Sequence, residues 1–291
     1  MTTKEQEPMN PVVVILTPCF GGTCTIGYTQ SLLATMNVLA LHGMCAHVLF
    51  CANDYLVPRA RNLLLAEAYE RYEDATHFFF VDADMVWSPH DVLKLLAHRL
   101  PVVAGAYPIQ RYHWPKEQEQ EQKGEEGKQS ESLPTSLLRY NLRYTTNPAD
   151  GIAVTDTGLV EVVHVGTGFL LLARETIAAM RAAYPETRYI DNTGYKTGEV
   201  YALFDCAIVQ GQYLSEDYLF CHRWLLLSST HRVYVDVTVA LTHIGPESFE
   251  GRLLSRVHKK QEQGEKQKEE QGEQQKEEQG VEQGEKEEQK E

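Results

Sequence analysis

The 291-residue sequence has no long hydrophobic run, and this absence limits the kinds of structure it can form. Its first apolar run, residues 11–16, is far shorter than the roughly 20 residues of a membrane-spanning helix and follows a polar, acidic start. The run is also too short for a secretory signal. We therefore expect no transmembrane segment and a cytoplasmic location.

The cysteines lack the patterns of a metal or redox site. No Cys-x-x-Cys pair and no zinc-binding spacing occurs among them, and several lie in apolar segments. Such cysteines are typical of reduced thiols in the core of a cytosolic protein. The six residues are Cys19, Cys24, Cys45, Cys51, Cys206 and Cys221.

Two common phosphate-binding loops are also missing. No Gly-x-Gly-x-x-Gly follows a strand-like segment, and no Gly-Lys-Ser or Gly-Lys-Thr triplet is present. The sequence therefore lacks the signatures of a typical dinucleotide-binding protein and of a P-loop NTPase.

A basic surface for nucleic acid is absent as well. Of the net charge of −14, the segment 259–291 supplies −5 and the segment 116–131 supplies −3, so the rest of the chain carries about −6. A general nucleic-acid partner requires clustered positive charge. We therefore expect no nucleic-acid partner.

The same two segments define the expected domain limits. Their Gln, Glu, Lys and Gly composition cannot bury apolar surface, whereas 43% hydrophobic residues in the whole chain suffice for a core. We predict a flexible N-terminus over 1–10 and one folded domain over 11–256. Within it lies a disordered insertion at 116–131, and a disordered low-complexity tail covers 257–291.

Strand-like and helix-like segments alternate through the first hundred residues. Four apolar strands are expected at 12–16, 47–51, 77–81 and 102–106, and helices at 25–42, 59–71 and 88–98. Ser88 and Pro89 make a good start for the last of these helices. Strands that are apolar throughout indicate a parallel sheet with both faces covered.

The second half of the domain mixes both kinds of element. Strands are expected at 160–165, 169–172 and 233–237, with helices at 175–183 and 216–227. The prediction is an α/β, Rossmann-like fold with a mostly parallel central sheet flanked by helices, and a smaller mixed region beside it.

The segment around residues 77–84 is the most informative, because a buried-type strand leads directly into Asp82 and Asp84. Carboxylates are hard ligands that suit Mg²⁺ or Mn²⁺, and the carboxyl edge of a parallel sheet is where α/β folds bind ligands. The alternative is an ordinary turn, which also favours aspartate.

The residues around this motif resemble those of a known family. Ala60-Arg61-Asn62, a helix, an apolar strand and Asp-x-Asp occur in the order found in GT-A fold glycosyltransferases, particularly family 2. Further matches follow at Val-Gly-Thr-Gly-Phe (165–169), at Ser-Glu-Asp (215–217) and at Thr-His-Ile-Gly (242–245). The resemblance covers about 12–251 apart from the insertion, and it implies a GT-A-type fold whose mixed region binds the acceptor.

The resemblance implies a metal site. Asp82 and Asp84 would hold Mn²⁺ or Mg²⁺, with Asp84 as the more direct ligand, and His243 would complete the shell. An imidazole ligand shifts the preference to manganese. The alternative for His243 is a strand-end histidine bonded to the backbone.

It also implies a catalytic base. Asp217 would take the proton from an acceptor hydroxyl that attacks the anomeric carbon, which gives inversion and needs no covalent intermediate. The alternative is an acid that complements the dipole at a helix start.

The nucleotide would bind at the carboxyl ends of the first two strands, and the segment with Gly166 and Gly168 would pass beneath the sugar. Arg61 could equally be a surface helical residue, and the glycines could mark a simple β-bulge. The predicted binding residues are Thr17, Pro18, Asn53, Asp54, Arg61, Asp82, Ala83, Gly166, Thr167, Gly168 and Glu216. The aromatic segment 107–114 is either a lid over the ligands or an anchor for its own loop.

The expected activity is metal-dependent transfer of a hexosyl or related sugar from a nucleoside diphosphate sugar, with a UDP-sugar as first choice. The acceptor would be a hydroxyl of a glycan, a protein or a lipid-linked molecule. A nucleotidyltransferase of related fold is the alternative enzyme, although the Gly-rich activating loop of those enzymes is missing. A carbohydrate-binding relative without catalysis is the third reading, and the intact Asp82, Asp84 and Asp217 count against it.

Overall fold

The structure is a computed structural model, and it describes residues 10–112, 138–146, 151–195, 198–245 and 248–252. The predicted flexible N-terminus, apart from residue 10, lies outside the described residues. So do the predicted disordered insertion at 116–131 and the predicted tail at 257–291.

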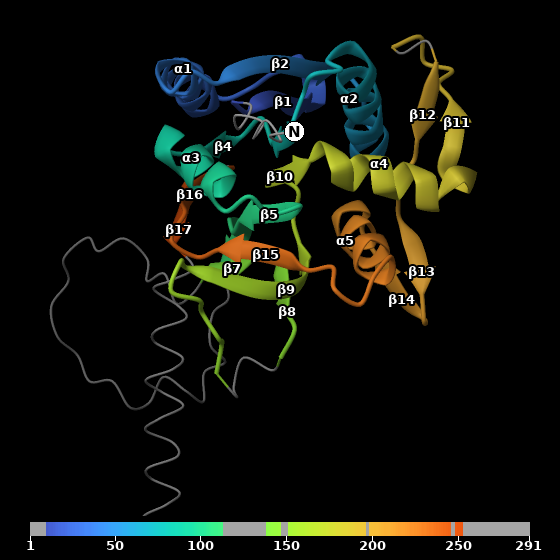
Figure 1. The fold of residues 1–291 in the computed structure, drawn as a ribbon. Coiled ribbons are helices and arrows are strands. Elements are labelled where there is room, and N and C mark those ends of the chain that lie inside the picture. The colour runs from blue at the N-terminus through green and yellow to red at the C-terminus, as the bar shows by residue number, and fades with distance from the viewer. Residues whose placement is uncertain (1–9, 113–137, 147–150, 196–197, 246–247, 253–291) are drawn as a thin grey trace, which may run out of the picture.

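An eight-stranded sheet forms the centre of the molecule (Figure 1). Its strands lie in the order β2, β1, β3, β10, β5, β15, β9, β8. Their bounds in that order are Cys45–Ala52, Val12–Cys19, His77–Val81, Phe169–Ala173, Val102–Gly105, Val233–Asp236, Leu159–Val165 and Leu142–Tyr144.

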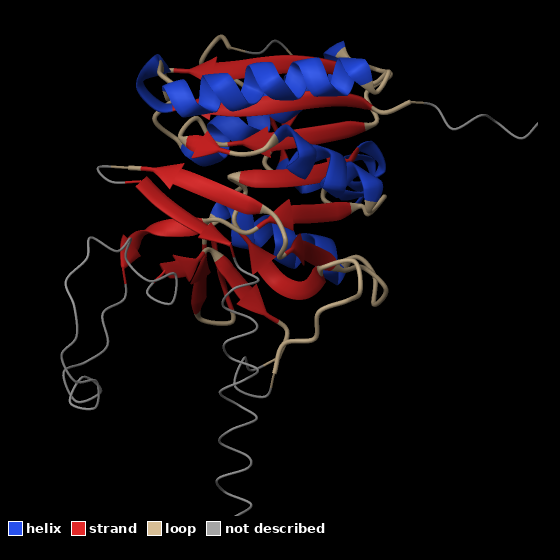
Figure 2. Cartoon of the chain, turned by 90° about the vertical axis from the view of Figure 1, so that its left-hand side faces the viewer, coloured by secondary structure: helices blue, strands red, loops and turns tan. Residues whose placement is uncertain are grey.

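Helices cover both faces of this sheet: in Figure 1 they lie to its left and right, and Figure 2 looks onto the face that lies to the left in Figure 1. Helices α1 (Ile26–Leu41) and α3 (Pro89–Ala97) pack on one face. Helices α2 (Val57–Arg71), α4 (Arg174–Ala183) and α5 (Glu216–Leu226) pack on the other.

Successive residues of β1 and β3 enter different cores, because side chains alternate across a strand. Phe78 and Phe80 join the core under α2, α4 and α5, whereas Phe79 and Val81 join the core under α1 and α3. All four are fully buried. Burial on both faces explains why these strands are apolar throughout, and it confirms the predicted α/β class.

The sheet is more mixed than the prediction of a mostly parallel sheet suggests. Six strands run in one direction, but β10 and β9 run in the opposite direction, so four of the seven strand pairs are antiparallel. Strand β10 lies between β3 and β5, where it separates two strands that would otherwise be neighbours. An apolar run alone does not reveal strand direction, so the sequence could not show this.

Short strands form the smaller mixed region. One three-stranded sheet consists of β4 (Met85–Val86), β16 (Ala240–Ile244) and β17 (Ser248–Arg252). Three two-stranded sheets pair β6 with β7, β11 with β12 and β13 with β14. Their bounds in chain order are Pro108–Tyr112, Leu138–Tyr140, Arg188–Ile190, Glu199–Tyr201, Ala207–Val209 and Gln212–Leu214.

The predicted longer strands and helices are all present, and their ends differ by at most three residues, the largest difference being at the end of β1. Ser88 is the N-cap of α3 and Pro89 its first residue, as expected. None of the six cysteines forms a disulfide, and Cys19, Cys51 and Cys221 are buried as predicted for thiols of the core, whereas Cys24 and Cys45 are exposed and Cys206 is half-buried. No helix in the described parts of the chain is long and apolar enough to cross a membrane.

Candidate functional site

The turn that carries the two aspartates begins where β3 ends. The Asp82 N–H donates to the Gly168 carbonyl at 3.1 Å, and the Met85 N–H donates back to the Asp82 carbonyl at 3.1 Å. The Thr25 N–H, just before α1, donates to the Ala83 carbonyl at 2.9 Å. Two other segments and a hydrogen bond within the turn therefore hold the aspartates at the carboxyl edge of the sheet.

Pairing between β4 and β16 brings His243 to this turn. His243 lies opposite Met85, and the Ile244 N–H donates to the Asp84 carbonyl at 2.9 Å. The His243 Nδ1 lies 2.9 Å from the Pro108 carbonyl, so Nδ1 carries the proton and donates it there. Nε2, which lies 3.3 Å from the Asp84 Oδ2, is then the nitrogen that can accept a proton or a metal.

The charge of Asp84 affects this histidine. Burial is the largest single effect and lowers the pKa of His243, but Asp84, the Pro108 carbonyl and Asp82 together outweigh burial, and the net direction is upward. The alternative from the sequence, a strand-end histidine bonded to the backbone, therefore describes the Nδ1 side of the ring. The Nε2 side of the ring contacts Asp84.

Arg61 is buried beside the same turn rather than exposed on its helix. Its Nη2 lies 2.9 Å from the Asp82 Oδ1, and its Nε lies 3.6 Å from the Glu216 Oε1. Both carboxylates raise the pKa of Arg61 against the opposing effect of burial. Its Nη1 has no hydrogen-bond partner among the described residues.

Arg61, Asp82 and Asp84 line a cavity of about 360 Å³, a size that suits a small ligand. A second cavity of about 300 Å³ shares Asp54 with it and includes Asn53 and Tyr195 in its wall. The first cavity is lined by Pro18, Phe20, Thr23, Cys24, Thr25, Asp54, Val57, Arg61, Asp82, Ala83 and Asp84.

Asp54 is held in a defined orientation between the cavities. Its carboxylate accepts two hydrogen bonds of 2.8 Å from Arg59, which lower the pKa of Asp54 against the effect of burial. Asn53 beside it has a φ of 62°, and the ring of Phe20 packs edge-on against Tyr55 at 5.4 Å.

Asp217 is buried at the start of α5, next to Glu216. Its Oδ1 accepts hydrogen bonds from the Ser215 hydroxyl and from the Tyr218 N–H, the latter at 2.8 Å. Its Oδ2 accepts a hydrogen bond of 3.1 Å from the Asn141 side-chain amide. Burial and the nearby charge of Asp217 raise the pKa of Glu216, while Arg61 opposes this rise.

Neighbouring side chains leave no room for a Cβ atom at positions 166 and 168, so both positions require glycine. A Cβ on Gly166 would lie 2.3 Å from the Tyr107 hydroxyl oxygen, and one on Gly168 would lie 2.8 Å from the Asp82 Oδ2. Thr167 is buried, and its Oγ1 has no hydrogen-bond partner among the described residues. The close approach that the glycines allow is therefore to Tyr107 and Asp82.

The metal site stays a prediction, but the fit of its predicted ligands to an ion can be examined. No group of three His, Cys, Asp or Glu side chains in the described ranges is arranged to hold a metal. Asp82 faces Arg61, which leaves Asp84 and His243 as the pair whose spacing can be compared with that of metal ligands. Adjacent ligands of an octahedral ion with bonds of about 2.1 Å lie about 3 Å apart, which agrees with the 3.3 Å between the Asp84 Oδ2 and the His243 Nε2.

The predicted binding residues fall in different parts of the site. Five of them line the first cavity, namely Pro18, Asp54, Arg61, Asp82 and Ala83, and Asn53 lines the second. Thr17 lines neither cavity, because its hydroxyl is buried 2.5 Å from that of Tyr28. Gly166, Thr167 and Gly168 pass behind Asp82, and Glu216 contacts Arg61. Their roles toward a ligand stay predictions.

Two residues of the site have a place that the sequence did not reveal. The Tyr107 hydroxyl accepts the Gly168 N–H at 3.2 Å, so Tyr107 anchors a loop rather than forming a lid. Residues 113–114 of the same aromatic segment lie outside the described residues. Asn141 had no signal in the sequence, since it belongs to no motif.

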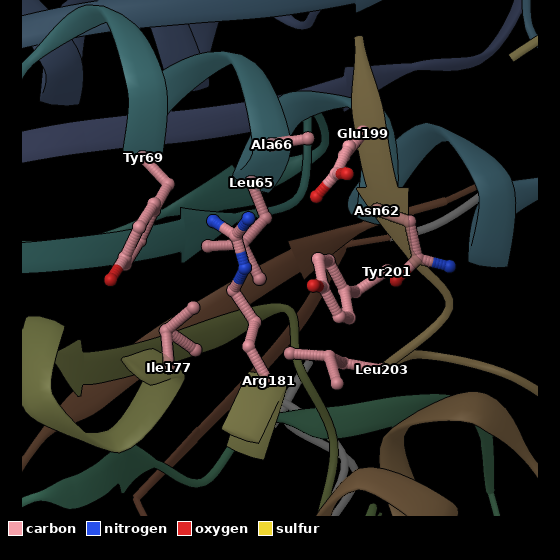
Figure 3. Close-up of a pocket in the computed structure, with 9 residues that line it drawn as sticks. All are labelled: Asn62, Leu65, Ala66, Tyr69, Ile177, Arg181, Glu199, Tyr201 and Leu203. Carbon is pink, nitrogen blue, oxygen red and sulfur yellow. The ribbon is translucent and has the colours of Figure 1, made fainter. Parts of the chain in front are cut away.

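Two other cavities do not share these features. One, of about 10 Å³, holds no more than a single water, and Arg181 lies there between the rings of Tyr69 and Tyr201, 4.4 Å from each (Figure 3). A hollow of about 1090 Å³ lies at the opposite edge of the sheet, where Pro11 precedes β1 and His77 begins β3. It contains none of the predicted site residues.

Comparisons with known proteins add little. No protein-family model and no curated protein matches the chain. Among solved structures, A197 from STIV has a TM-score of 0.44 and 16% identity, covering 84% of this chain and 90% of its own. A glycosyltransferase involved in the glycosylation of the major capsid of PBCV-1 has a TM-score of 0.29 and 10% identity, covering 60% and 66%. Similarities at this level do not determine a function.

Proposed function

We propose that this protein is a metal-dependent glycosyltransferase that moves a sugar from a nucleoside diphosphate sugar, with a UDP-sugar as first choice, to an acceptor hydroxyl. One observation carries the proposal. The buried Arg61 contacts Asp82 in the cavity wall and Glu216 at the start of α5, so a ligand-sized cavity and the buried carboxylate of Asp217 lie beside each other.

The cavity supports binding of an anion. A buried guanidinium usually has all of its donors satisfied, yet the Nη1 of Arg61 makes no hydrogen bond to the described residues. A guanidinium can hold phosphate oxygens with its planar set of donors. The diphosphate of a sugar donor would occupy this position.

Asp84 and His243 would hold Mn²⁺ or Mg²⁺ together with the diphosphate. The imidazole favours manganese, and the Pro108 carbonyl fixes the tautomer that leaves Nε2 available. When bound, such an ion stabilises the negative charge that grows on the diphosphate as the sugar leaves.

Asp217 has the properties of a general base. Donors on both carboxylate oxygens hold its orientation, and a carboxylate oxygen has two lone pairs, so Oδ2 can accept a further proton donor. In the transfer, Oδ2 takes the acceptor's proton while the acceptor oxygen bonds to the anomeric carbon. The bond from that carbon to the diphosphate breaks, and attack from the opposite side inverts the configuration.

The test is a thermal-shift panel of nucleoside diphosphates and their sugars with and without Mn²⁺. A ligand at 100 times its Kd stabilises the folded state by about 2.7 kcal/mol, which raises the Tm by roughly 5–10 °C for a domain of this size. Binding should be followed by release of free nucleoside diphosphate from the matching sugar donor.

Asp84→Ala should abolish the Mn²⁺-dependent part of the shift, whereas Asp156→Asn, which changes an exposed acid on a loop outside the cavity, should keep it. A rise in Tm on adding nucleotide that is equal with and without Mn²⁺ would contradict metal dependence. Release of pyrophosphate from a nucleoside triphosphate and a sugar phosphate would indicate nucleotidyl transfer instead. Donor binding without turnover would favour a carbohydrate-binding protein.

A further inference from the structure

Asn141 occupies a constrained position at the corner between β7 and β8. Its N–H donates to the Tyr107 carbonyl at 3.4 Å, and its carbonyl accepts the Gly166 N–H at 2.8 Å. A Cβ on Gly166 would lie only 2.4 Å from the Asn141 Nδ2. Two backbone hydrogen bonds and a close neighbour therefore fix where the Asn141 side chain can lie.

The side-chain amide of Asn141 connects this corner to α5. Its Nδ2 donates to the Asp217 Oδ2 at 3.1 Å and lies 3.5 Å from the Tyr107 hydroxyl oxygen. The residues of this contact are 76 positions apart in the sequence. Asn141 thus links the loop behind Asp82 to the predicted base.

We infer that Asn141 is a positioning residue for the proposed transfer, whose amide orients the Asp217 carboxylate. The inference rests on the proposed function for its catalytic part, while the pairing of the two side chains stands on geometry. A hydrogen bond donated to an ionised carboxylate also stabilises the charged state over the neutral one.

Other charges also face Asp217 and would act together with Asn141. The charge of Asp217 raises the pKa of Arg61 on α2 and that of Glu216 beside it, so both groups lie close enough to interact with the carboxylate. The titratable groups whose pKa responds to the charge of Asp217 are Arg61, Tyr107, His164, Glu216, Tyr218 and Cys221. These groups are unchanged in the variants below, so differences between variants report on Asn141.

The first variants remove the donor. Asn141→Ala should lower the turnover of UDP-sugars to UDP by about tenfold or more and move the acidic limb of the pH–rate profile upward by about one pH unit. Asn141→Asp has the same size but places a second carboxylate against Asp217, so its acidic limb should move further. UDP affinity with Mn²⁺, measured by thermal shift, should stay unchanged in both.

A double variant exchanges the two groups. Asp217→Asn alone turns an acceptor into an amide that faces the amide of Asn141, which should lower the Tm. Asn141→Asp/Asp217→Asn restores one amide and one carboxylate across the contact, so the Tm should recover. Turnover should stay as low as in Asp217→Asn, because the carboxylate then lies on the other side of the contact.

Thr176→Val is the control for a purely structural loss. The Thr176 hydroxyl is buried and donates to the Pro101 carbonyl at 2.9 Å, beside the end of β10 that pairs with the start of β3, away from the cavity. Its Tm should fall, while its pH–rate profile should match that of the wild type.

The outcomes separate the two proposals. If Asn141→Ala lowers the Tm but leaves the acidic limb in place, as Thr176→Val does, Asn141 is structural and the inference is wrong. If the double variant recovers no stability, the pairing with Asp217 is wrong whatever the activity. If the wild type releases no nucleoside diphosphate from any sugar donor, the proposed function fails, and the positioning role fails with it even if the double variant recovers its stability.

Discussion

Arg61→Met tests whether a buried cation holds the two halves of the site together. The substitution keeps a long unbranched side chain but removes the charge that contacts Asp82 and Glu216. The Arg61 side chain is 5% exposed, while those of Asp82 and Glu216 are 26% and 18% exposed. Two partly buried carboxylates would lose the guanidinium between them.

The expected cost follows from this burial. Removing one partner of a fully buried ion pair costs about 3–5 kcal/mol, and exposed pairs contribute about 0–1 kcal/mol. Because the two carboxylates keep some contact with water, we expect a loss of about 2–4 kcal/mol for Arg61→Met. At about 2–4 °C per kcal/mol, the Tm should fall by roughly 4–16 °C.

The loss should also depend on pH. Burial and Asp217 raise the pKa of Glu216, and Arg61 partly opposes this, so the pKa of Glu216 should rise further in the variant. The folded state then holds the proton more tightly than the unfolded state, whose Glu titrates near about 4.3. The variant therefore loses stability as the pH rises from the pKa of Glu216 in the unfolded state to its higher pKa in the folded state.

The assay is urea unfolding at pH 5 and pH 7, with Arg71→Met as a control on the same helix. Arg71 is 61% exposed and pairs with Glu67 at 3.7 Å, so its loss should cost less than about 1 kcal/mol at either pH. Arg61→Met should be more destabilising at pH 7 than at pH 5. An effect no larger than that of Arg71→Met, or equal at both pH values, would refute the reasoning.

Three other substitutions test the site. His243→Ala should weaken Mn²⁺-linked nucleotide binding less than Asp84→Ala does, because the carboxylate and the phosphates remain as ligands; equal losses in titrations with Mn²⁺ would contradict this. Asp217→Asn should lower turnover by roughly 10² to 10⁴-fold with donor affinity unchanged, and near-normal turnover would place the base elsewhere. Gly168→Ala should cost about 1–3 kcal/mol in urea unfolding, because its Cβ would lie 2.8 Å from the Asp82 Oδ2, and an unchanged midpoint would show that the loop yields.

The sequence by itself determined the elements and the outline of the site. Apolar runs such as 77–81 predict buried strands because each residue there must be buried on one face or the other, and that property is local. The Asp82 and Asp84 pair was recognisable for the same reason, since a turn that follows a buried strand is readable within ten residues. The predicted helices around Arg61 and Asp217 are also local patterns, and the structure contains both.

Only the tertiary structure decided which of these local features meet. Asp84 and His243 are 159 positions apart, and they meet because β4 pairs with β16 in one register. The reversed direction of β10, the burial of Thr17 against Tyr28 and the contact of Asn141 with Asp217 likewise depend on how distant segments align. A local pattern records how much of a residue is buried but not against what, and strand pairing and packing between distant segments supply that partner.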